Sequence, residues 1–456
     1  MQSNNSGLKR PLTDKGSSNS SQKKPKESVL IRYLESPVCL TSVQRVPPSL
    51  NVGCVTLKSL IGDPDLELMV QINYMIDVPF VMSHVHENIR DGLRTIVYHG
   101  LRLRMDEVMA LNASIATVFP RVTMHSVPVA GMGTHHSKAM ILFYRDGTME
   151  LVIHTANMIE QDWRNKTQGV FKTARLSKKS ETTGLSTCAF ERDLLEYLGR
   201  YFEHEQLTSR VRQYDFSRIK AVLIASAPGK YSGPDKKKWG HLKLRAVLRQ
   251  QVEVPKELIP GSKIICQISS IGSLGKQSQD WLRGEFEASL SSYRNSRNFG
   301  PVDLCVIYPT AENVRTSANL SKPAWGEMRN GDVFDVKSYE LGVLIFPGLY
   351  EDCGESGEIL HISMMNSTVL DPYPEPSTLK LDDFNPEGPS RNSKNGDEND
   401  GMSSEENDLH HTIGVVPIRL PYDLPLKKYD FTRGDHVWLA DKQFPGQDDF
   451  GNTLAP

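Results

Sequence analysis

The residues best suited to covalent chemistry are a histidine and a lysine that end a glycine-rich segment, Gly131-Met132-Gly133-Thr134-His135-His136-Ser137-Lys138. In an extended chain, side chains two positions apart point to the same face, so His136 and Lys138 are expected to lie together. A neutral imidazole can attack phosphorus while an ammonium stabilises the charge on the non-bridging oxygens. The pair therefore predicts phosphoryl transfer with His136 as the nucleophile, and His135 is interpreted as a structural residue.

The segments around this pair predict how it is positioned. The glycine-rich segment is not a P-loop, because the order GxxxxGK[ST] is absent. It leads into an apolar run at 139–144, and a second run at 151–154 follows the turn-forming residues 145–148. These runs predict a buried β-hairpin, with Asn157 just beyond its second strand.

Apolar runs and helical patterns alternate along the rest of the chain. Further strands are expected at 220–224, 264–268, 302–308 and 341–346, and helices at 189–205, 241–252 and 279–292. This alternation is typical of a layered α/β fold.

A short repeat links the two halves. Residues 155–158 read Thr-Ala-Asn-Met and residues 317–320 read Ser-Ala-Asn-Leu, and in both copies a tryptophan, Trp163 or Trp325, stands six residues after the asparagine. The two copies stand too far apart in the chain for a solenoid repeat, but their separation suits two similar lobes with an active site between them.

Ordered motifs over roughly residues 30–456 give the sequence a family resemblance. These motifs are GTHHSKAMILFY, VIHTANMIEQDWRNKTQG, SAPGKYSGPDKKKWGHLKLR, ISSIGSLG, IYPTAENVRTS, SANLSKPAWG, SYELGVLIFP and PYDLP. Together they resemble the tyrosyl-DNA phosphodiesterases of the phospholipase D superfamily. The resemblance implies an α/β fold of two similar phospholipase D-like lobes, 29–218 and 219–456. Each lobe would be a mixed β-sheet flanked by helices, with the active-site cleft between the lobes.

The resemblance also implies a role for particular residues. His136 would form a phosphohistidine with the 3′-phosphate of DNA, with Lys138, Asn157 and Asn319 holding the phosphoryl oxygens. Gln168 and Glu340 would orient the histidines. The residues implied to contact DNA are Ser270, Ser273, Ser321 and Met132, the last standing where relatives can carry an aromatic residue that stacks on a base. No metal or cofactor is implied.

The implied function is that of a DNA-repair phosphodiesterase. It would hydrolyse 3′-phosphotyrosyl ends derived from topoisomerase I, and other 3′-blocked ends, as a 3′ exonuclease does. Its partners would be single- and double-stranded DNA ends and a topoisomerase I-derived peptide. The superfamily places an aspartate five residues after the lysine, but Phe143 stands there, which argues against a lipid hydrolase.

The second His-x-Lys that the resemblance implies is missing. His136 precedes Asn157 across the expected hairpin, whereas the equivalent stretch before Asn319 contains no histidine. The formal match His241-Leu242-Lys243 is rejected because it opens an expected helix. We expect a segment to be missing near 315–317, which leaves the second lobe incomplete.

This loss predicts a specific defect. The second histidine would protonate the leaving group and then activate water, and a positioned acid or base contributes about 10²–10⁴ in rate. A tyrosine phenol, with a pKa of about 10, can leave without full protonation more readily than an alkoxide. We expect impaired hydrolysis and a persistent protein–DNA adduct. Two alternatives remain, a non-catalytic DNA-end-binding pseudoenzyme and a truncated isoform.

The net charge of −2 conceals two oppositely charged segments. Residues 1–28 hold six basic and two acidic residues, and 381–408 hold nine acidic and two basic residues. Both are expected to be disordered, the first as a basic tail and the second within an acidic insertion at 375–411. Basic clusters at 9–10 and 23–26, twelve residues apart, resemble a bipartite nuclear import signal. We expect a nuclear monomer, with no membrane segment and with six unpaired cysteines.

Overall fold

The computed structural model describes residues 28–180, 188–202, 204–256, 259, 262–277, 280–295, 302–307, 319–350, 359–366, 378–380, 411–428, 430 and 432. The expectations about the basic tail at 1–27, the acidic residues 381–410 and the junction 308–318 lie outside these residues.

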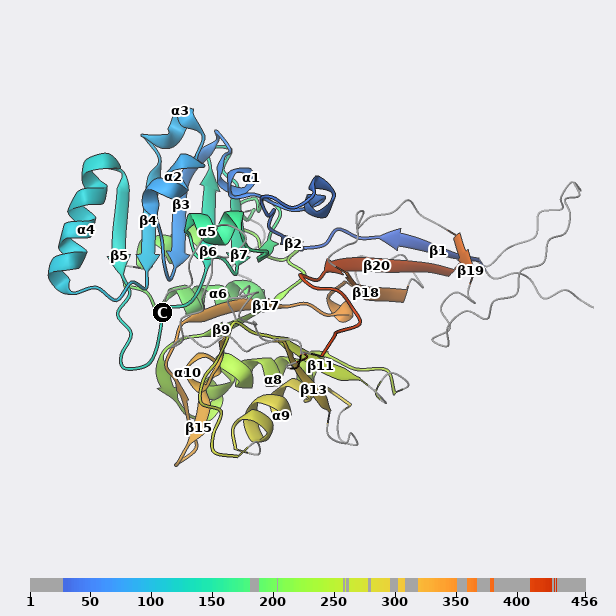
Figure 1. The fold of residues 1–456 in the computed structure, drawn as a ribbon. Coiled ribbons are helices and arrows are strands. Elements are labelled where there is room, and N and C mark those ends of the chain that lie inside the picture. The colour runs from blue at the N-terminus through green and yellow to red at the C-terminus, as the bar shows by residue number, and fades with distance from the viewer. Residues whose placement is uncertain are drawn as a thin grey trace, which may run out of the picture.

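The first lobe is built on a seven-stranded mixed sheet (Figure 1). In spatial order its strands are β2 (Val38–Leu40), β8 (Gly169–Lys172), β7 (Met149–His154), β6 (Ala139–Tyr144), β3 (Leu66–Asn73), β4 (Arg94–His99) and β5 (Val122–Ser126). The expected hairpin is confirmed, because β6 and β7 pair in antiparallel register. Every residue of both strands is buried, so the sheet must be covered on both faces.

Helices cover the two faces of this sheet. The helices whose apolar residues pack on one face are α1 (Leu57–Ile61), α2 (Val78–Ser83), α3 (Glu87–Arg90), α4 (Met105–Val118) and α5 (Glu160–Arg164). On the other face, α6 (Ala189–Leu198) and α7 (Glu205–Val211) share one core cluster with residues of the second lobe. In Figure 1, α6 accordingly lies between the two lobes.

The second lobe contains smaller sheets. Its strands are β9 (Val222–Ser226), β10 (Gly229–Tyr231), β11 (Lys263–Gln267), β12 (Ser270–Ile271), β13 (Asp303–Ile307), β14 (Asn319–Leu320), β15 (Glu327–Arg329), β16 (Val333–Val336) and β17 (Glu340–Leu344). They form the sheets β10-β16-β15, β11-β13, β12-β14 and β17-β9. The helices are α8 (Gly240–Gln251), α9 (Ala288–Leu290) and α10 (Lys322–Trp325), with short 3₁₀ helices at Gly233–Lys238 and Pro347–Tyr350. A further short 3₁₀ helix, Pro48–Asn51, lies between β2 and α1 of the first lobe.

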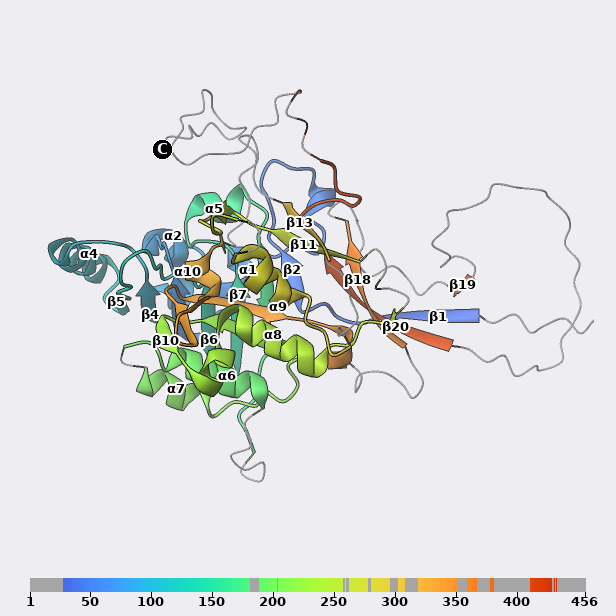
Figure 2. The ribbon, with the colours of Figure 1, turned by 90° about the horizontal axis from the view of Figure 1, so that it is seen from below.

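A separate four-stranded sheet joins a strand near the start of the chain to strands of its last quarter, and the expected domain boundaries stay a prediction. Its strands, in order, are β18 (Ile359–Met365), β20 (His411–Arg419), β1 (Ser28–Tyr33) and β19 (Thr378–Lys380). Residues 28–33 therefore pair with strands of the second half instead of joining the first-lobe sheet. Figures 1 and 2 both show this sheet extending away from the two lobes. Ser28, 378–380 and His411 are strand residues, although the sequence assigned them to disordered segments.

Two expected helices are shorter than predicted. The first, expected at 189–205, ends at Leu198 because Gly199 forms the C-cap, and α7 begins at Glu205. The second, expected at 279–292, is a π-helical segment, Leu282–Glu287, followed by the single turn α9. Apolar periodicity locates a helix more reliably than it locates its ends.

Candidate active site

Backbone hydrogen bonds join the two lobes at the glycine-rich segment 131–138. The amide of Tyr339 donates to the carbonyl of Thr134, and the amide of His136 donates to the carbonyl of Tyr339, both at 2.9 Å. A Cβ at Gly133 would overlap the carbonyl of Lys337, so glycine is required where the chains approach. The glycine-rich segment is thus the contact through which the second lobe reaches His136.

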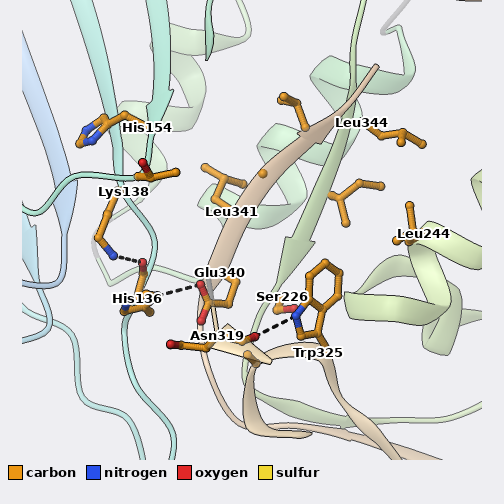
Figure 3. Close-up of a pocket in the computed structure, with 15 residues that line it drawn as sticks. His136, Lys138, His154, Ser226, Leu244, Asn319, Trp325, Glu340, Leu341 and Leu344 are labelled. Carbon is orange, nitrogen blue, oxygen red and sulfur yellow. Dashed lines mark hydrogen bonds and ion pairs between the residues drawn. The ribbon is translucent and has the colours of Figure 1, made fainter. Parts of the chain in front are cut away.

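This contact places a carboxylate against the candidate nucleophile. Glu340 Oε2 lies 3.0 Å from His136 Nδ1 (Figure 3). A carboxylate accepts the Nδ1 proton, which leaves Nε2 as the basic nitrogen. The family resemblance assigned Glu340 a histidine-orienting role, and the observed contact is the geometry that such a role requires.

Lys138 lies beside His136 but is almost fully buried. Its Nζ donates to the carbonyl of His136 at 2.9 Å. Burial lowers the pKa of Lys138 to about 8, while the nearby carboxylates of Glu340 and Asp162 oppose this shift. The two residues precede β6 in an extended segment, and the amide of His154 in β7 donates to the carbonyl of Lys138. Lys138 therefore carries a positive charge at neutral pH although it is almost fully buried.

A cavity of about 330 Å³ opens between the lobes at this point. His136, Lys138, Asn319 and Glu340 line it together with His154, Thr155 and Ser226 (Figure 3). The remaining wall is mostly apolar and comes from the second lobe, namely Ile224, Leu244, Ala324, Trp325, Leu341, Gly342, Val343 and Leu344.

Asn319 is held at the cavity by hydrogen bonds to its side-chain oxygen and its backbone carbonyl. Its Oδ1 accepts hydrogen bonds from the hydroxyls of Ser269 and Ser270. Trp325 Nε1 donates to its backbone carbonyl at 3.0 Å. Ser270, which the sequence assigned to DNA contact, thus bonds the asparagine directly in this structure.

Asn157 and Gln168 do not line the cavity. The backbone and side-chain amides of Asn157 donate to Asp162, which is buried and paired with Lys166 at 2.6 Å. Gln168 Oε1 accepts a hydrogen bond of 2.6 Å from Thr155, so its observed partner is a threonine and not a histidine. The structure therefore does not place these two residues where the sequence expected them.

The remaining expected DNA contacts lie on or near the surface. Met132 is 74% exposed and Ser273 is exposed, whereas Ser321 forms the N-cap of α10. Met132 follows Gly131, whose φ of +60° makes the turn that projects it. None of the three lines the cavity, so the expected DNA contacts stay predictions.

The structure places His135 and His241, which the sequence analysis excluded from the chemistry, in structural contacts. His135 is buried, its Nδ1 bonds the carbonyl of Asn73 and its Nε2 bonds Tyr201, and burial lowers its pKa to about 3. His241 lies in α8 with Nδ1 2.8 Å from Ser289 Oγ. Phe143 belongs to the first-lobe core.

Sequence reasoning missed two residues at the site. His154 lines the cavity, and burial together with the nearby charge of Lys138 lowers its pKa to about 3, against a hydrogen bond with the backbone of Ala156. Asp162 holds Asn157 in place. The signal for Asp162 was its position five residues after the asparagine within the first repeat copy. The signal for His154 was a histidine in an otherwise apolar strand.

Two negative observations apply to the described part of the chain. It contains no group of three or more His, Cys, Asp or Glu side chains placed to hold a metal ion. In the same residues, no helix combines the length and the apolar character needed to cross a bilayer.

Solved structures resemble this fold. A crystal structure of a mutant of yeast tyrosyl-DNA phosphodiesterase 1 superposes with a TM-score of 0.56 and 17% identity, covering 88% of this chain and 98% of the yeast chain. Another yeast tyrosyl-DNA phosphodiesterase structure gives 0.50 at 18% identity, covering 67% and 89%. At this identity the likeness supports the two-lobed phospholipase D-like fold.

Curated sequences are also similar. A probable tyrosyl-DNA phosphodiesterase of Schizosaccharomyces pombe is 25% identical over 454 residues, covering 70% of this chain and 83% of the relative. Tyrosyl-DNA phosphodiesterase 1 of Arabidopsis thaliana is 27% identical, covering 92% and 76%.

The family profile described as tyrosyl-DNA phosphodiesterase matches residues 37–317 and 314–430. These two segments take in most of the chain, including every residue of the cavity wall. The chain therefore belongs to the tyrosyl-DNA phosphodiesterase family, a family of phosphodiesterase hydrolases.

Proposed function

We propose that this protein is a DNA-repair phosphodiesterase that removes tyrosyl and other adducts from DNA 3′ ends through a phosphohistidine at His136. The observation that carries the proposal is the 3.0 Å contact of His136 Nδ1 with Glu340, at a cavity that also holds Lys138 and Asn319. The names of its relatives supply the substrate class.

In the first step His136 Nε2 attacks phosphorus and the bond to the tyrosyl oxygen breaks. The phenolate takes the electron pair and later gains a proton from solvent. Lys138 and the amide of Asn319 stabilise the charge that builds on the non-bridging oxygens. Glu340 stabilises the imidazole as it becomes positively charged.

In the second step water attacks phosphorus, the P–N bond breaks and His136 is restored with a free 3′-phosphate. This step needs a base that can accept the proton of water on the face opposite His136. In the described residues, the second-lobe wall of the cavity is largely apolar, with Ser226 and Asn319 as uncharged polar groups and Glu340, which contacts His136, as its charged group. We propose that hydrolysis is therefore slow and that the phosphohistidine adduct accumulates.

Two features of the comparisons support the proposal that a missing segment causes the slow hydrolysis. The family profile matches in two pieces that meet at 314–317. The alignment to the fission yeast relative spans 454 positions but includes only 70% of the 456 residues of this chain. Many aligned positions of the relative therefore fall opposite gaps in this chain.

A denaturing gel with a labelled 3′-phosphotyrosyl oligonucleotide tests both steps. We expect a slowly migrating protein–oligonucleotide adduct that forms with wild type and not with His136→Ala. Rapid release of free 3′-phosphate without an adduct would contradict the impaired second step. Equal binding of the oligonucleotide by both proteins, with neither adduct nor product, would favour the end-binding pseudoenzyme.

Nuclear location is part of the proposal and rests on the basic clusters at 9–10 and 23–26. Residues 1–28 fused to a fluorescent protein should concentrate it in nuclei, and replacing Lys23, Lys24 and Lys26 by alanine should abolish this. A uniform distribution of the unmodified fusion would contradict it.

A further inference from the structure

The second lobe retains two pairs of strands that correspond to pairs in the first lobe. Strands β9 and β17 pair antiparallel, as β2 and β8 do. Strands β11 and β13 pair parallel, as β3 and β4 do. The order along the chain is also the same in both lobes. The two pairs are therefore equivalent in topology.

The lobes differ in what lies between these pairs. In the first lobe the hairpin β6–β7 lies between β8 and β3 and pairs with both. In the described part of the second lobe, β17 pairs only with β9, and β11 only with β13. Within that part, each of these two strands therefore has a second edge with no strand along it.

The apolar side chains of β17 and β11 are only partly buried. All residues of β6 and β7 are buried, whereas all five residues of β17 are half-buried. In β11, Ile265 is 37% exposed. Leu341, Val343 and Leu344 of β17 line the interlobe cavity. Exposed strand edges with apolar side chains readily accept another strand.

The two edges belong to one folded body. Apolar residues of β9 and α8 form one small cluster, and Ile268, Trp281, Phe286 and Leu320 form another. Leu290 and Trp325 pack against both clusters. The edges of β17 and β11 therefore border one continuous group of packed residues.

We propose that the free edges of β17 and β11 form a binding site for a two-stranded β-hairpin, supplied as a separate peptide, which completes the second sheet by strand addition. The first lobe defines the occupant. Its hairpin runs antiparallel to both neighbours, and its two strands are buried on both faces and mostly apolar. The occupant therefore runs antiparallel to β11 with its first strand and to β17 with its second.

A fluorescent peptide of residues 133–157 is a suitable probe, because this sequence forms the equivalent hairpin in the first lobe. Anisotropy with the full chain should show saturable binding. Hydrogen exchange should slow at the amides of 263–267 and 340–344 and stay unchanged in β4 and β5. Protection confined to β3 and β8 would mean exchange with the native hairpin and would contradict the proposal.

Two controls test strand pairing itself. The peptide with Ile141→Pro and Val152→Pro cannot complete the ladder, so its binding should be lost. In the full chain, Ile265→Lys places a charge on the free edge and should weaken binding at least about tenfold. Leu103→Lys is the matched control, because Leu103 is also 37% exposed but lies in the first lobe. It should leave the affinity unchanged.

Equal affinity for the proline and unmodified peptides, or no saturable binding at all, would overturn the proposal. Thermal melts show whether each lysine variant is folded, and the peptide comparison with wild type does not depend on them. His136→Ala should bind the peptide like wild type. Peptide binding and phosphohistidine chemistry can therefore fail independently.

Discussion

In both lobes the segment that carries the asparagine pairs in parallel with the segment that follows a strand. The lobes differ in the sheet that lies next to this pairing. In the first lobe, Ile76 and Met158 form a parallel bridge just after the β3 strand and the Asn157 motif. In the second lobe, β12 and β14 place Ile271 opposite Leu320 in the same way. The second asparagine is therefore held at the cavity although its lobe has no described strand equivalent to β7. Local loop pairing and a tryptophan suffice to place it.

The difference between the two sheets separates the site residues that lie next to buried central strands from those that do not. The first-lobe hairpin has every residue buried and directly precedes or follows the residues that it positions. The second lobe contributes Glu340 and Asn319 from strand ends that do not require a full sheet. His136 and Glu340 are thus in contact although the described part of the second lobe has no hairpin equivalent to β6–β7.

The largest expected effect is the loss of adduct formation when His136 is replaced. It tests directly whether only the first lobe supplies a catalytic histidine. If the first lobe alone supplies the nucleophile, His136→Ala should lower adduct formation by about 10⁴-fold or more, as loss of a nucleophile does. His241→Ala should leave the rate per folded molecule unchanged, because His241 lies in α8 and bonds Ser289. Single-turnover kinetics on the 3′-phosphotyrosyl oligonucleotide measures both. Comparable loss in the two variants would contradict the assignment.

The next effect compares the equivalent residues Glu340 and Gln168. Glu340→Gln keeps the size of the side chain but removes the charge that stabilises the imidazole. We expect adduct formation to fall about 10²–10⁴-fold. Gln168→Ala should cost less than about tenfold, since its observed partner is Thr155 and its effect on His136 would be indirect. A larger loss for Gln168→Ala would show that the lobes are more symmetric than the structure indicates.

The third effect concerns stability. Leu142 in β6 is fully buried, so Leu142→Ala should destabilise the protein by about 2–5 kcal/mol. Leu344 in β17 is half-buried beside the cavity, so Leu344→Ala should cost about 1 kcal/mol or less. Thermal melts of the two variants measure the difference. Equal losses would mean that the second-lobe edge is packed as tightly as the first-lobe centre.

The smallest effect is a dependence on pH. Because burial lowers the pKa of Lys138 to about 8, its charge is lost as the pH rises above that value. The rate of adduct formation should fall about tenfold per pH unit above pH 8, if the charged lysine is required. The variant Lys138→Met should be slow and should lose this descending limb. A limb that persists in the variant would assign it to another group.

The titration of Lys138 also affects the stability of the fold, in the direction opposite to its effect on the rate. Between pH 8 and the ordinary lysine pKa of 10.5, the unfolded chain binds more protons than the folded one, so stability should rise with pH. His135 and His154, whose pKa values are lowered to about 3, should make stability fall as the pH drops from 6.5 to 3.

Much of the fold was predictable from local patterns. The hairpin β6–β7, the strands near 222, 264, 303 and 341, and helix α8 follow from apolar runs that require burial on one or both faces. Helix ends and the four-stranded sheet that contains β1 were not predictable. The end of a helix depends on caps, and β1, near the start of the chain, pairs with strands from its last quarter. No periodicity within residues 28–33 identifies such partners.

The candidate site divides in the same way. The sequence by itself determined which chemistry we propose, because a His-x-Lys pair, the repeated asparagine and the absent second histidine are all statements about residue types and order. Only the tertiary structure decided that Glu340 contacts His136, that Gln168 bonds Thr155, and that Lys138 is buried enough to lower its pKa. Contact and burial depend on how segments from different lobes pack together, and residue spacing along the chain does not encode that distance.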